Sequence, residues 1–271
     1  GSEMCIRDRN KIWEIIVMLE KIIKIVENAG KIYKNADKDL GISEKSSKFD
    51  LVTKYDKAIQ DYLTDEFLKL IPSAHFLDEE GDGNKELTDG YCFIIDPIDG
   101  TTNFIKGFQH SAICVGLAKD RELIIGVVLD PDLNNIYYAE KGKGAFLNGK
   151  PIHISDCSLD RSLVLFGTCP YDHDLSKKSF ETAEKVFYKS LEVRRSGSAA
   201  LDICYVAAGK ADLYFELIIR PWDWAGATVI LKEAGGTVTT VDGNELDLNG
   251  LNSYCCGNEK NVKEFYEIYK S

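Results

Sequence analysis

The chain has 271 residues, of which 44% are hydrophobic and 28% are charged, and its formal net charge is −11 at pH 7. This length and composition are ordinary for a globular protein with one large domain or two closely packed halves. The negative charge argues against a general nucleic-acid binder, which normally carries a basic stripe. It does not exclude a phosphorylated substrate, because bound cations can reverse the local field.

The N-terminal region predicts an amphipathic helix over residues 12–26. Its apolar residues recur at helical spacing and are interrupted by charges such as Glu14 and Lys21. The segment is therefore neither a signal peptide nor a membrane span, and we expect no membrane partner. Residues 1–9 are interpreted as a non-native leader, since Gly1-Ser2 resembles a cleavage scar, and they carry no functional argument.

The eight cysteines contain no CxxC pair. Several of them lie in apolar runs, where a free cysteine behaves as a small buried hydrophobe. This pattern favours a reducing compartment over a disulfide framework. We therefore expect a cytoplasmic protein.

The next part of the chain predicts one more helix and then a run of short strands. The helix is expected from Tyr55 to Ile71 and ends before Pro72. The strands are expected at 75–77, 91–95, 111–118, 124–129 and 135–139. The Asn148-Gly149 pair that follows indicates a tight hairpin turn.

After residue 155, strands and helices alternate. Strands are expected at 162–166, 192–195, 211–216 and 254–255, and helices at 175–189, 199–208, 225–234 and 261–269. Separate blocks of strands and helices indicate a layered α/β or α+β fold and not a regular barrel. The break at 151–157 predicts a boundary between an N-terminal half, 10–154, and a C-terminal half, 155–271, with one composite active site between them.

Residues 96–104, with the sequence DPIDGTTNF, are the most informative segment of the chain. They follow the apolar run 91–95, so they predict a strand that breaks into a loop and then starts a helix. Asp96 and Asp99 are three residues apart, and Pro97 between them fixes one backbone dihedral. Both carboxylates and the intervening carbonyl can then face one pocket, as oxygen-binding cations require.

The same segment continues into a candidate phosphate cradle. Gly100, Thr101 and Thr102 present free backbone N–H groups at the expected helix start. Carboxylates that bind metals, placed beside a phosphate cradle, indicate metal-assisted phosphate chemistry.

Two further carboxylate segments are candidates for the same site. Glu79 and Glu80 end a predicted short strand, although such a pair in a loop is usually solvated surface. Asp223 lies in the segment 221–226, where it could simply cap the helix that follows. From the residues alone, both interpretations stay open.

Residues 144–150 have the spacing of a nucleotide-binding P-loop. The next residue is Pro151, where that motif needs Ser or Thr to bind magnesium. The Asn148-Gly149 pair also predicts a hairpin and not a loop that opens a helix. No nucleotide site is expected here.

Four collinear segments resemble the inositol monophosphatase family of lithium-sensitive phosphatases, and most of all its bacterial inositol-1-monophosphatases. They are 96–104 with Glu79 upstream, 222–226, 45–56 and 195–200, and the resemblance extends from about Lys11 to the end of the chain. It implies an αβαβα sandwich of the inositol monophosphatase/fructose-1,6-bisphosphatase type. It also implies a homodimeric, Mg²⁺-dependent phosphomonoesterase that hydrolyses myo-inositol monophosphates with a metal-activated water.

The resemblance further implies roles for individual residues. Two or three Mg²⁺ ions, for which Mn²⁺ could substitute, would be held by Glu79, Asp96, the Ile98 carbonyl, Asp99 and Asp223. The catalytic residues would be Thr101, Asp56 and Glu79, the first two orienting the attacking water. The substrate would contact Asp99, Gly100, Thr101, Ser198, Glu216 and Asp223. Lys45 would lie in a mobile loop over the site.

The chemistry of these residues agrees with magnesium. Mg²⁺ prefers carboxylate and carbonyl oxygens, whereas zinc would call for His or Cys. The four histidines of the chain show no paired spacing. Two positions depart from the common pattern: Asp78 adds negative charge behind the metal site, and Arg220 precedes the Trp222-Asp223 pair.

The substrate stays open at this point. The alternatives within the superfamily are a fructose-1,6-bisphosphatase, another sugar-phosphate phosphatase, a histidinol-phosphate phosphatase and a nucleotide 3′-phosphatase. From another class comes a catalytically silent regulatory or binding protein, against which the complete set of acidic residues argues. A small phosphorylated polyol or sugar is the expected partner, and no nucleic acid is expected.

Overall fold

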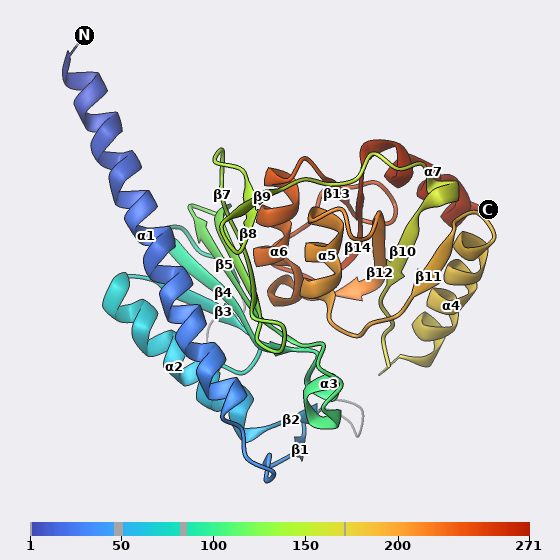
Figure 1. The fold of residues 1–271 in the computed structure, drawn as a ribbon, viewed down its shortest axis with the longest axis horizontal. Coiled ribbons are helices and arrows are strands. Elements are labelled where there is room, and N and C mark those ends of the chain that lie inside the picture. Colours follow the sequence, from blue (N-terminus) through green and yellow to red (C-terminus); the bar gives the residue numbers. More distant parts are fainter. Residues whose placement is uncertain (1, 46–50, 82–85, 171) are drawn as a thin grey trace.

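The computed structural model describes residues 2–45, 51–81, 86–170 and 172–271, with side chains from Met18 onward. Helices and sheets alternate in five layers, so the expected αβαβα sandwich is confirmed (Figure 1). The outer helices α1 (Ser2–Lys34) and α2 (Lys54–Leu70) cover one face of a seven-stranded sheet. None of the described helices combines the length and apolar character needed to cross a bilayer.

The seven-stranded sheet is a nearly continuous meander. Its order is β3-β4-β5-β6-β7-β8-β9, and only the β3–β4 pair is parallel. Its strands are β3 (His75–Asp78), β4 (Tyr91–Asp99), β5 (Ala112–Lys119), β6 (Glu122–Asp130), β7 (Asn135–Glu140), β8 (Ala145–Leu147) and β9 (Lys150–Ile152). The predicted Asn148-Gly149 turn joins β8 to β9, two strands that the sequence did not predict.

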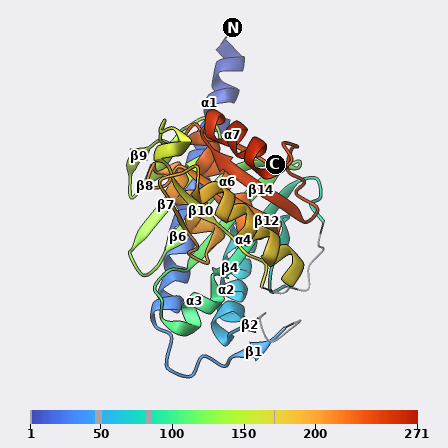
Figure 2. The same cartoon turned by 90° about the vertical axis from the view of Figure 1, so that its right-hand side faces the viewer.

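The second sheet has five strands in the order β11-β10-β12-β14-β13. They are β10 (Leu163–Phe166), β11 (Glu192–Arg194), β12 (Leu213–Ile219), β13 (Thr237–Thr239) and β14 (Asn252–Gly257). Helices α5 (Ala199–Ala207) and α6 (Pro221–Glu233) lie between the two sheets. Helices α4 (His173–Phe187) and α7 (Glu259–Lys270) cover the outer face of the second sheet (Figure 2).

Three short elements complete the chain. A small antiparallel pair, β1 (Ser43–Glu44) and β2 (Leu51–Val52), precedes α2, and α3 (Thr101–Lys106) follows β4. The 3₁₀ turn η1 (Leu159–Arg161) leads into β10, just after the segment 151–157 that we expected to separate two halves. The division of the chain at that segment stays a prediction.

Several predicted boundaries were wrong, and two of them bear on the site. Strand β4 does not end at Ile95 but runs through the motif to Asp99, because its pairing with β5 resumes after an irregularity between Asp96 and Asp99. Helix α6 begins at Pro221 and not at residue 225, since proline is well suited to a first helical turn that needs no N–H. The first helix, expected over 12–26, spans Ser2–Lys34 and includes the interpreted leader.

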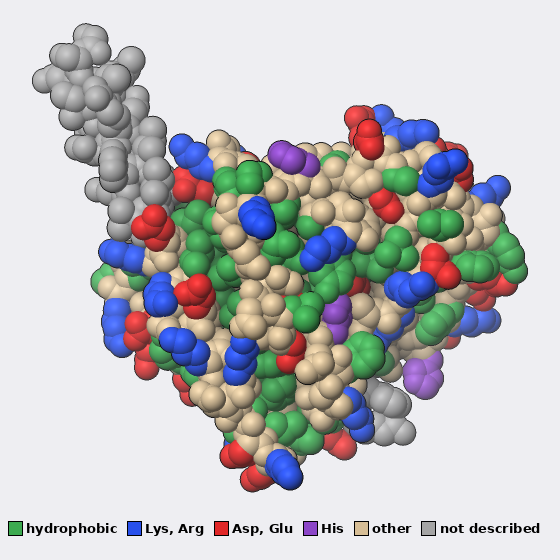
Figure 3. Space-filling model, viewed as in Figure 1, with side chains coloured by type: hydrophobic (Ala, Val, Ile, Leu, Met, Phe, Trp, Pro, Cys, Tyr) green, Lys and Arg blue, Asp and Glu red, His purple; other side chains and the backbone are tan. Residues whose placement is uncertain are grey.

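Charged side chains are interspersed on the molecular face shown in Figure 3. Acidic and basic groups alternate across its described part, and the basic ones do not gather into a stripe. This distribution agrees with the net charge of −11. It gives that face no electrostatic footprint for a nucleic acid.

Helix α6 lies against the seven-stranded sheet with almost no space between the two backbones. A Cβ atom added to Gly126 on β6 would lie 2.0 Å from the Gly226 carbonyl oxygen, and one added to Gly226 would lie 2.6 Å from the Val115 carbonyl oxygen. Real Cβ atoms do not approach other atoms so closely. Glycine at both positions is therefore what lets the α6 backbone rest directly on β5 and β6.

We predict that Gly126→Ala lowers the free energy of unfolding by about 1–3 kcal/mol, because the added methyl group overpacks this contact. Urea denaturation followed by circular dichroism measures the change. Gly250→Ala is the matched control, since a Cβ there would approach only Asp247 Oδ2, at an ordinary 3.6 Å. Equal stability of the two variants would contradict the close contact.

Candidate active site

A cavity of about 440 Å³ lies where the edges of both sheets meet the first turns of α3, α5 and α6. Most of the charged side chains that line it are acidic. They are Glu79, Asp96, Asp99, Asp202, Glu216 and Asp223. The predicted site residues Ile98, Gly100, Thr101 and Ser198 line the same cavity. The structure thus brings together residues of all four motif segments, from Leu51 to Asp223, about 170 residues apart in the sequence.

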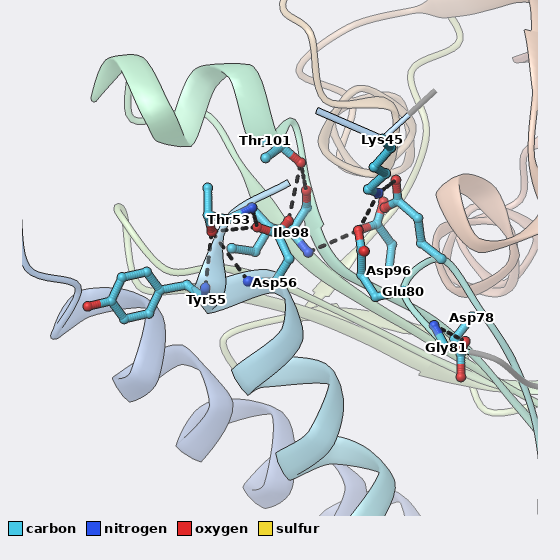
Figure 4. Close-up of polar contacts among 11 residues, drawn as sticks. Lys45, Thr53, Tyr55, Asp56, Asp78, Glu80, Gly81, Asp96, Ile98 and Thr101 are labelled. Atoms are coloured by element: carbon cyan, nitrogen blue, oxygen red, sulfur yellow. Dashed lines mark hydrogen bonds and ion pairs between the residues drawn. The ribbon is translucent and has the colours of Figure 1, made fainter. Parts of the chain in front are cut away.

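The end of β4 supplies the two central carboxylates. Asp96 and Asp99 are only 2% and 7% exposed. Asp96 Oδ1 accepts a hydrogen bond from the Ile98 N–H at 2.9 Å (Figure 4), so the backbone after Pro97 folds back on the first carboxylate. The irregular pairing between the two aspartates lets both side chains face the cavity, whereas strict alternation along the strand would separate them.

The first turn of α5 holds Asp99. Its carboxylate accepts hydrogen bonds from the Ser198 hydroxyl, from the Ala200 N–H at 2.8 Å and from the Ala199 N–H at 3.3 Å. Burial raises the pKa of Asp99 to about 6, although these donors oppose the shift. Ser198 is also the N-cap of α5 and accepts from the Leu201 N–H. Its hydroxyl therefore joins the motif loop to the helix.

The first turn of α2 brings Asp56 to Thr101, as predicted. The Thr53 N–H donates to Asp56 Oδ2 at 2.8 Å in a capping box, which fixes the carboxylate (Figure 4). The Thr101 hydroxyl lies 3.3 Å from Asp56 Oδ1 and 3.1 Å from the Ile98 carbonyl oxygen. Burial raises the pKa of Asp56. The pair is thus buried and oriented beside the two aspartates of β4.

Glu79 follows β3 and is held on both sides. Its N–H donates to the Ile95 carbonyl at 3.2 Å, and its Oε1 accepts from Lys45 Nζ at 2.8 Å. Lys45 also forms an ion pair with Glu80, a residue for which the sequence gave no role (Figure 4). Burial raises the pKa of Glu80 to about 7. Residues 46–50, next to Lys45, lie outside the described residues, so the expected mobile loop stays a prediction.

Asp223 completes the acidic group from the C-terminal part of the chain. It lies in the first turn of α6, and its Oδ2 accepts from the Arg220 N–H at 2.9 Å. The capping interpretation of the sequence is thus correct in part, because one oxygen serves the helix while the side chain also lines the cavity. The guanidinium of Arg220 lies over the Trp222 ring, with 5.4 Å between Cζ and the ring centroid.

The acidic side chains destabilise one another's charged forms. Burial raises the pKa of Asp96 and of Asp223 well above the usual range, and the charges of Glu79 and Asp99 raise both further. Among the described residues, no three Asp, Glu, His or Cys side chains already converge tightly enough to enclose an ion. Each carboxylate instead accepts from a neighbouring donor, such as Ile98, Ala200 or Lys45.

The donor chemistry nevertheless fits a hard divalent cation. The side chains of Glu79, Asp96, Asp99 and Asp223 all offer carboxylate oxygens. A cation stabilises a buried cluster of such like charges. Mg²⁺ keeps several of its water ligands and needs few protein ligands. A group of carboxylates that does not enclose the ion completely therefore suits Mg²⁺. The residues that would hold such ions are Glu79, Asp96, Ile98 through its carbonyl, Asp99 and Asp223.

Glu216 lies on β12, at another part of the cavity wall. Its Oε2 accepts a hydrogen bond from the Tyr214 hydroxyl two residues earlier. Burial raises the pKa of Glu216 to about 8. A Cβ added to Gly167, in the loop after β10, would lie 2.1 Å from Glu216 Cδ. Tyr214 and Gly167 therefore fix this side chain, and no motif in the sequence had indicated them.

The prediction that Asp78 adds negative charge behind the metal site stays a prediction. Its Oδ1 accepts from the Gly81 N–H at 2.7 Å, and its Oδ2 accepts from Gln60 Nε2 at 3.1 Å. The carboxylate therefore turns toward α2 and the following loop, apart from the Asp96 group (Figure 4). These contacts hold the carboxylate at the start of the loop that follows β3.

The motif loop is braced by contacts that the sequence did not indicate. Asn103 Nδ2 donates to the His110 carbonyl at 2.8 Å and to the Ser196 carbonyl at 3.0 Å. The Ser111 hydroxyl donates to the Gly100 carbonyl at 2.9 Å. Gly100 itself has φ +87°, which explains glycine at the start of α3. The Asn103 in the motif was the available signal, since a polar side chain directly after a turn often bonds the backbone nearby.

Comparisons with known proteins agree with this geometry. The model of the inositol monophosphatase family matches residues 16–269. The chain belongs to this family. Inositol monophosphatase 3 of Solanum lycopersicum is 37% identical over 236 residues, which cover 85% of this chain and 88% of that protein. Inositol-1-monophosphatase of Rhizobium meliloti is 32% identical and covers 93% and 94% of the two chains.

Solved structures share the whole fold. The extragenic suppressor protein suhB of Bartonella henselae superimposes with a TM-score of 0.87 at 28% identity, covering 94% of this chain and 99% of that one. A Staphylococcus aureus inositol monophosphatase II, crystallised with inositol monophosphate bound, gives a TM-score of 0.79 at 29% identity and covers 93% of each chain. The chain is thus a phosphoric monoester hydrolase of a family that is generally metal-dependent.

We predict that Ser198→Ala lowers the free energy of unfolding by about 1 kcal/mol, because it removes the N-cap of α5. Chemical denaturation at neutral pH measures the change, and Ser198→Thr is the control that keeps a hydroxyl group. If Ser198→Ala is as stable as the wild type, the hydroxyl is not the cap that joins α5 to Asp99.

Proposed function

We propose that this enzyme hydrolyses myo-inositol monophosphates to inositol and phosphate, with two or three Mg²⁺ ions in the active site. The observation that carries the proposal is the cavity itself. Carboxylates from β4, from the end of β3 and from α6 line it together with the first residues of α3, among them Thr101, whose hydroxyl lies 3.3 Å from Asp56 Oδ1. The bound inositol monophosphate in the staphylococcal relative supports the substrate class.

The metal ions would supply positive charge that lets an anionic nucleophile approach a doubly negative phosphate ester. Glu79, Asp96, Asp99 and Asp223 would hold them. The Thr101 hydroxyl would donate toward Asp56 or the Ile98 carbonyl, which leaves its oxygen to accept a hydrogen bond from the attacking water. The backbone N–H groups of Gly100 and Thr101 would contact the phosphate at the cavity wall.

Glu216 would bind hydroxyl groups of the inositol ring. The Tyr214 hydroxyl binds its carboxyl group, and the Gly167 backbone packs directly against that group. The Glu216 side chain therefore has one orientation in the cavity. Burial raises the pKa of this side chain, and its carboxyl oxygens can accept hydrogen bonds from ring hydroxyl groups. The remaining substrates of the superfamily, above all sugar phosphates, are the alternatives.

We also propose a homodimer. Large apolar side chains are exposed on α4 and the residues just after it: Phe180 at 58%, Phe187 at 44%, Tyr188 at 74% and Leu191 at 68%. Exposed apolar side chains gathered in one segment of the surface commonly mark a protein interface.

We predict that Asp96→Asn removes at least about 99.9% of the Mg²⁺-dependent turnover. In the proposed scheme Asp96 would contribute to more than one cation, and losing that charge would forfeit several kcal/mol of transition-state stabilisation. Phosphate release from inositol 1-phosphate measures the loss, and circular dichroism verifies the fold. A folded variant with substantial Mg²⁺-dependent activity would disprove the metal assignment.

We predict that Glu216→Gln lowers kcat/KM for inositol 1-phosphate by about ten- to hundredfold and spares p-nitrophenyl phosphate, which lacks ring hydroxyl groups. Asp223→Asn is the contrasting variant and should impair both substrates, since a metal serves every phosphate ester. Equal losses on the two substrates in Glu216→Gln would show that Glu216 does not select inositol. The enzyme would then be a general sugar-phosphate phosphatase.

A further inference from the structure

Asp202 is a cavity carboxylate that has no part in the proposed reaction. It lines the cavity from the first turn of α5, and only 1% of it is exposed. Burial raises the pKa of Asp99, and the charge of Asp202 raises it further, so the two carboxylates act on each other across the cavity wall. A buried negative charge at this place repels a phosphate group unless a cation offsets it.

His110, in the segment before β5, is placed to supply that cation. Its Nε2 lies 3.8 Å from Asp202 Oδ1, and its side chain is only 14% exposed. This distance is too long for a direct hydrogen bond but short enough for an ion pair. The Ser196 hydroxyl donates to the same Asp202 oxygen at 2.5 Å. Arg195 also lines the cavity, but its charge acts on Asp202 less strongly than that of His110.

The surroundings of His110 favour its protonated form. Burial alone would lower its pKa, but the carboxylate of Asp202 outweighs burial and raises the pKa above its usual value. The charges of Asp99 on β4 and Asp130 on β6 act in the same direction, and Tyr205 of α5 lies edge-on to the ring. His110 is therefore charged below this raised pKa and loses its charge as the pH rises through it.

The backbone of His110 packs against the loop that would bind the phosphate. Asn103 Nδ2 of α3 donates both to the His110 carbonyl, at 2.8 Å, and to the Ser196 carbonyl, at 3.0 Å. A Cβ added to Gly100 would lie 3.1 Å from the His110 carbonyl oxygen and 2.9 Å from that of Gly197. The imidazole thus pairs with α5 while the main chain of the same residue contacts the start of α3. The pair therefore lies at the phosphate end of the cavity.

We propose that His110 and Asp202 are a positioning pair for the phosphate group: positively charged His110 offsets the charge of Asp202 and thereby sets the affinity of the cavity for phosphate. Neither side chain needs to touch the substrate, because two opposite charges close together cancel most of each other's field in the cavity. The proposal rests on the proposed phosphatase function and adds to it a pair of residues that adjusts phosphate binding.

The test measures the Kd of inorganic phosphate by calorimetry in the presence of Mg²⁺, together with kcat and KM for p-nitrophenyl phosphate. The variants are His110→Gln, Asp202→Asn and the double variant, and His153→Gln, at an exposed histidine, is the control. His110→Gln should raise the Kd about tenfold, because it leaves one carboxylate without its cation. Asp202→Asn should lower the Kd, and the double variant should return close to the wild type.

The opposite signs of the two single variants distinguish charge from packing. Lost packing would weaken phosphate binding in both, and most of all in the double variant. The ratio of the Kd values of His110→Gln and the wild type should also approach 1 as the pH rises through the raised pKa of His110, because the wild type then loses the same charge. This ratio cancels the titration of phosphate itself.

A double variant that binds phosphate no better than His110→Gln overturns the proposal. So do single variants that both weaken binding, and a wild type that binds no phosphate. If His110→Gln does not fold, Asp202→Asn alone decides, according to whether it binds phosphate more tightly than the wild type. A wild type that hydrolyses neither p-nitrophenyl phosphate nor inositol 1-phosphate rejects the proposed function, while the phosphate titration still decides the role of the pair.

Discussion

The active site of this protein depends on holding several carboxylates close together in one buried cavity. Asp96, Asp99 and Asp223 lie in a cavity wall where burial raises their pKa values and the charges of neighbouring carboxylates raise them further. Such a cluster is unfavourable for folding, and the fold offsets it locally with donors. The first turns of α5 and α6 and the backbone after Pro97 each direct N–H groups at one carboxylate. Helix starts are therefore the means by which this fold assembles its active site.

The five-layer architecture explains why helix starts meet there. Helices α5 and α6 are covered by a sheet on both faces, so their sides are largely apolar and their carboxylates that line the cavity lie near their N-terminal ends. The N-terminal ends of both helices reach the same edge as the end of β4. In a layered fold with buried central helices, the active site therefore forms at the edges of the layers, where the helix ends and strand ends meet.

Much of this could be predicted from the sequence, and the limits have physical causes. The spacing of Asp96 and Asp99 around a proline indicated the central carboxylates, and Asp56 with Thr101 followed from the family resemblance. Glu80, Tyr214 and Gly167 could not be predicted, because their roles arise from contacts between segments distant in the sequence. The helical start at Pro221 was missed because a polar, aromatic first turn does not show the helical periodicity of the later residues. The orientation of Asp78 depended on Gln60, which no local pattern connects to it.

The glycine contact between α6 and the seven-stranded sheet has a consequence for how this family can diversify. Because the α6 backbone rests on β5 and β6 through Gly126 and Gly226, the distance from Asp223 to the aspartates of β4 is set by main-chain atoms. No side-chain substitution can adjust that distance by a few tenths of an ångström. The loops that carry Thr168 and Arg195 line the same cavity outside the packed layers. Substitutions in these loops can therefore change the cavity wall without disturbing the backbone contact that positions Asp223.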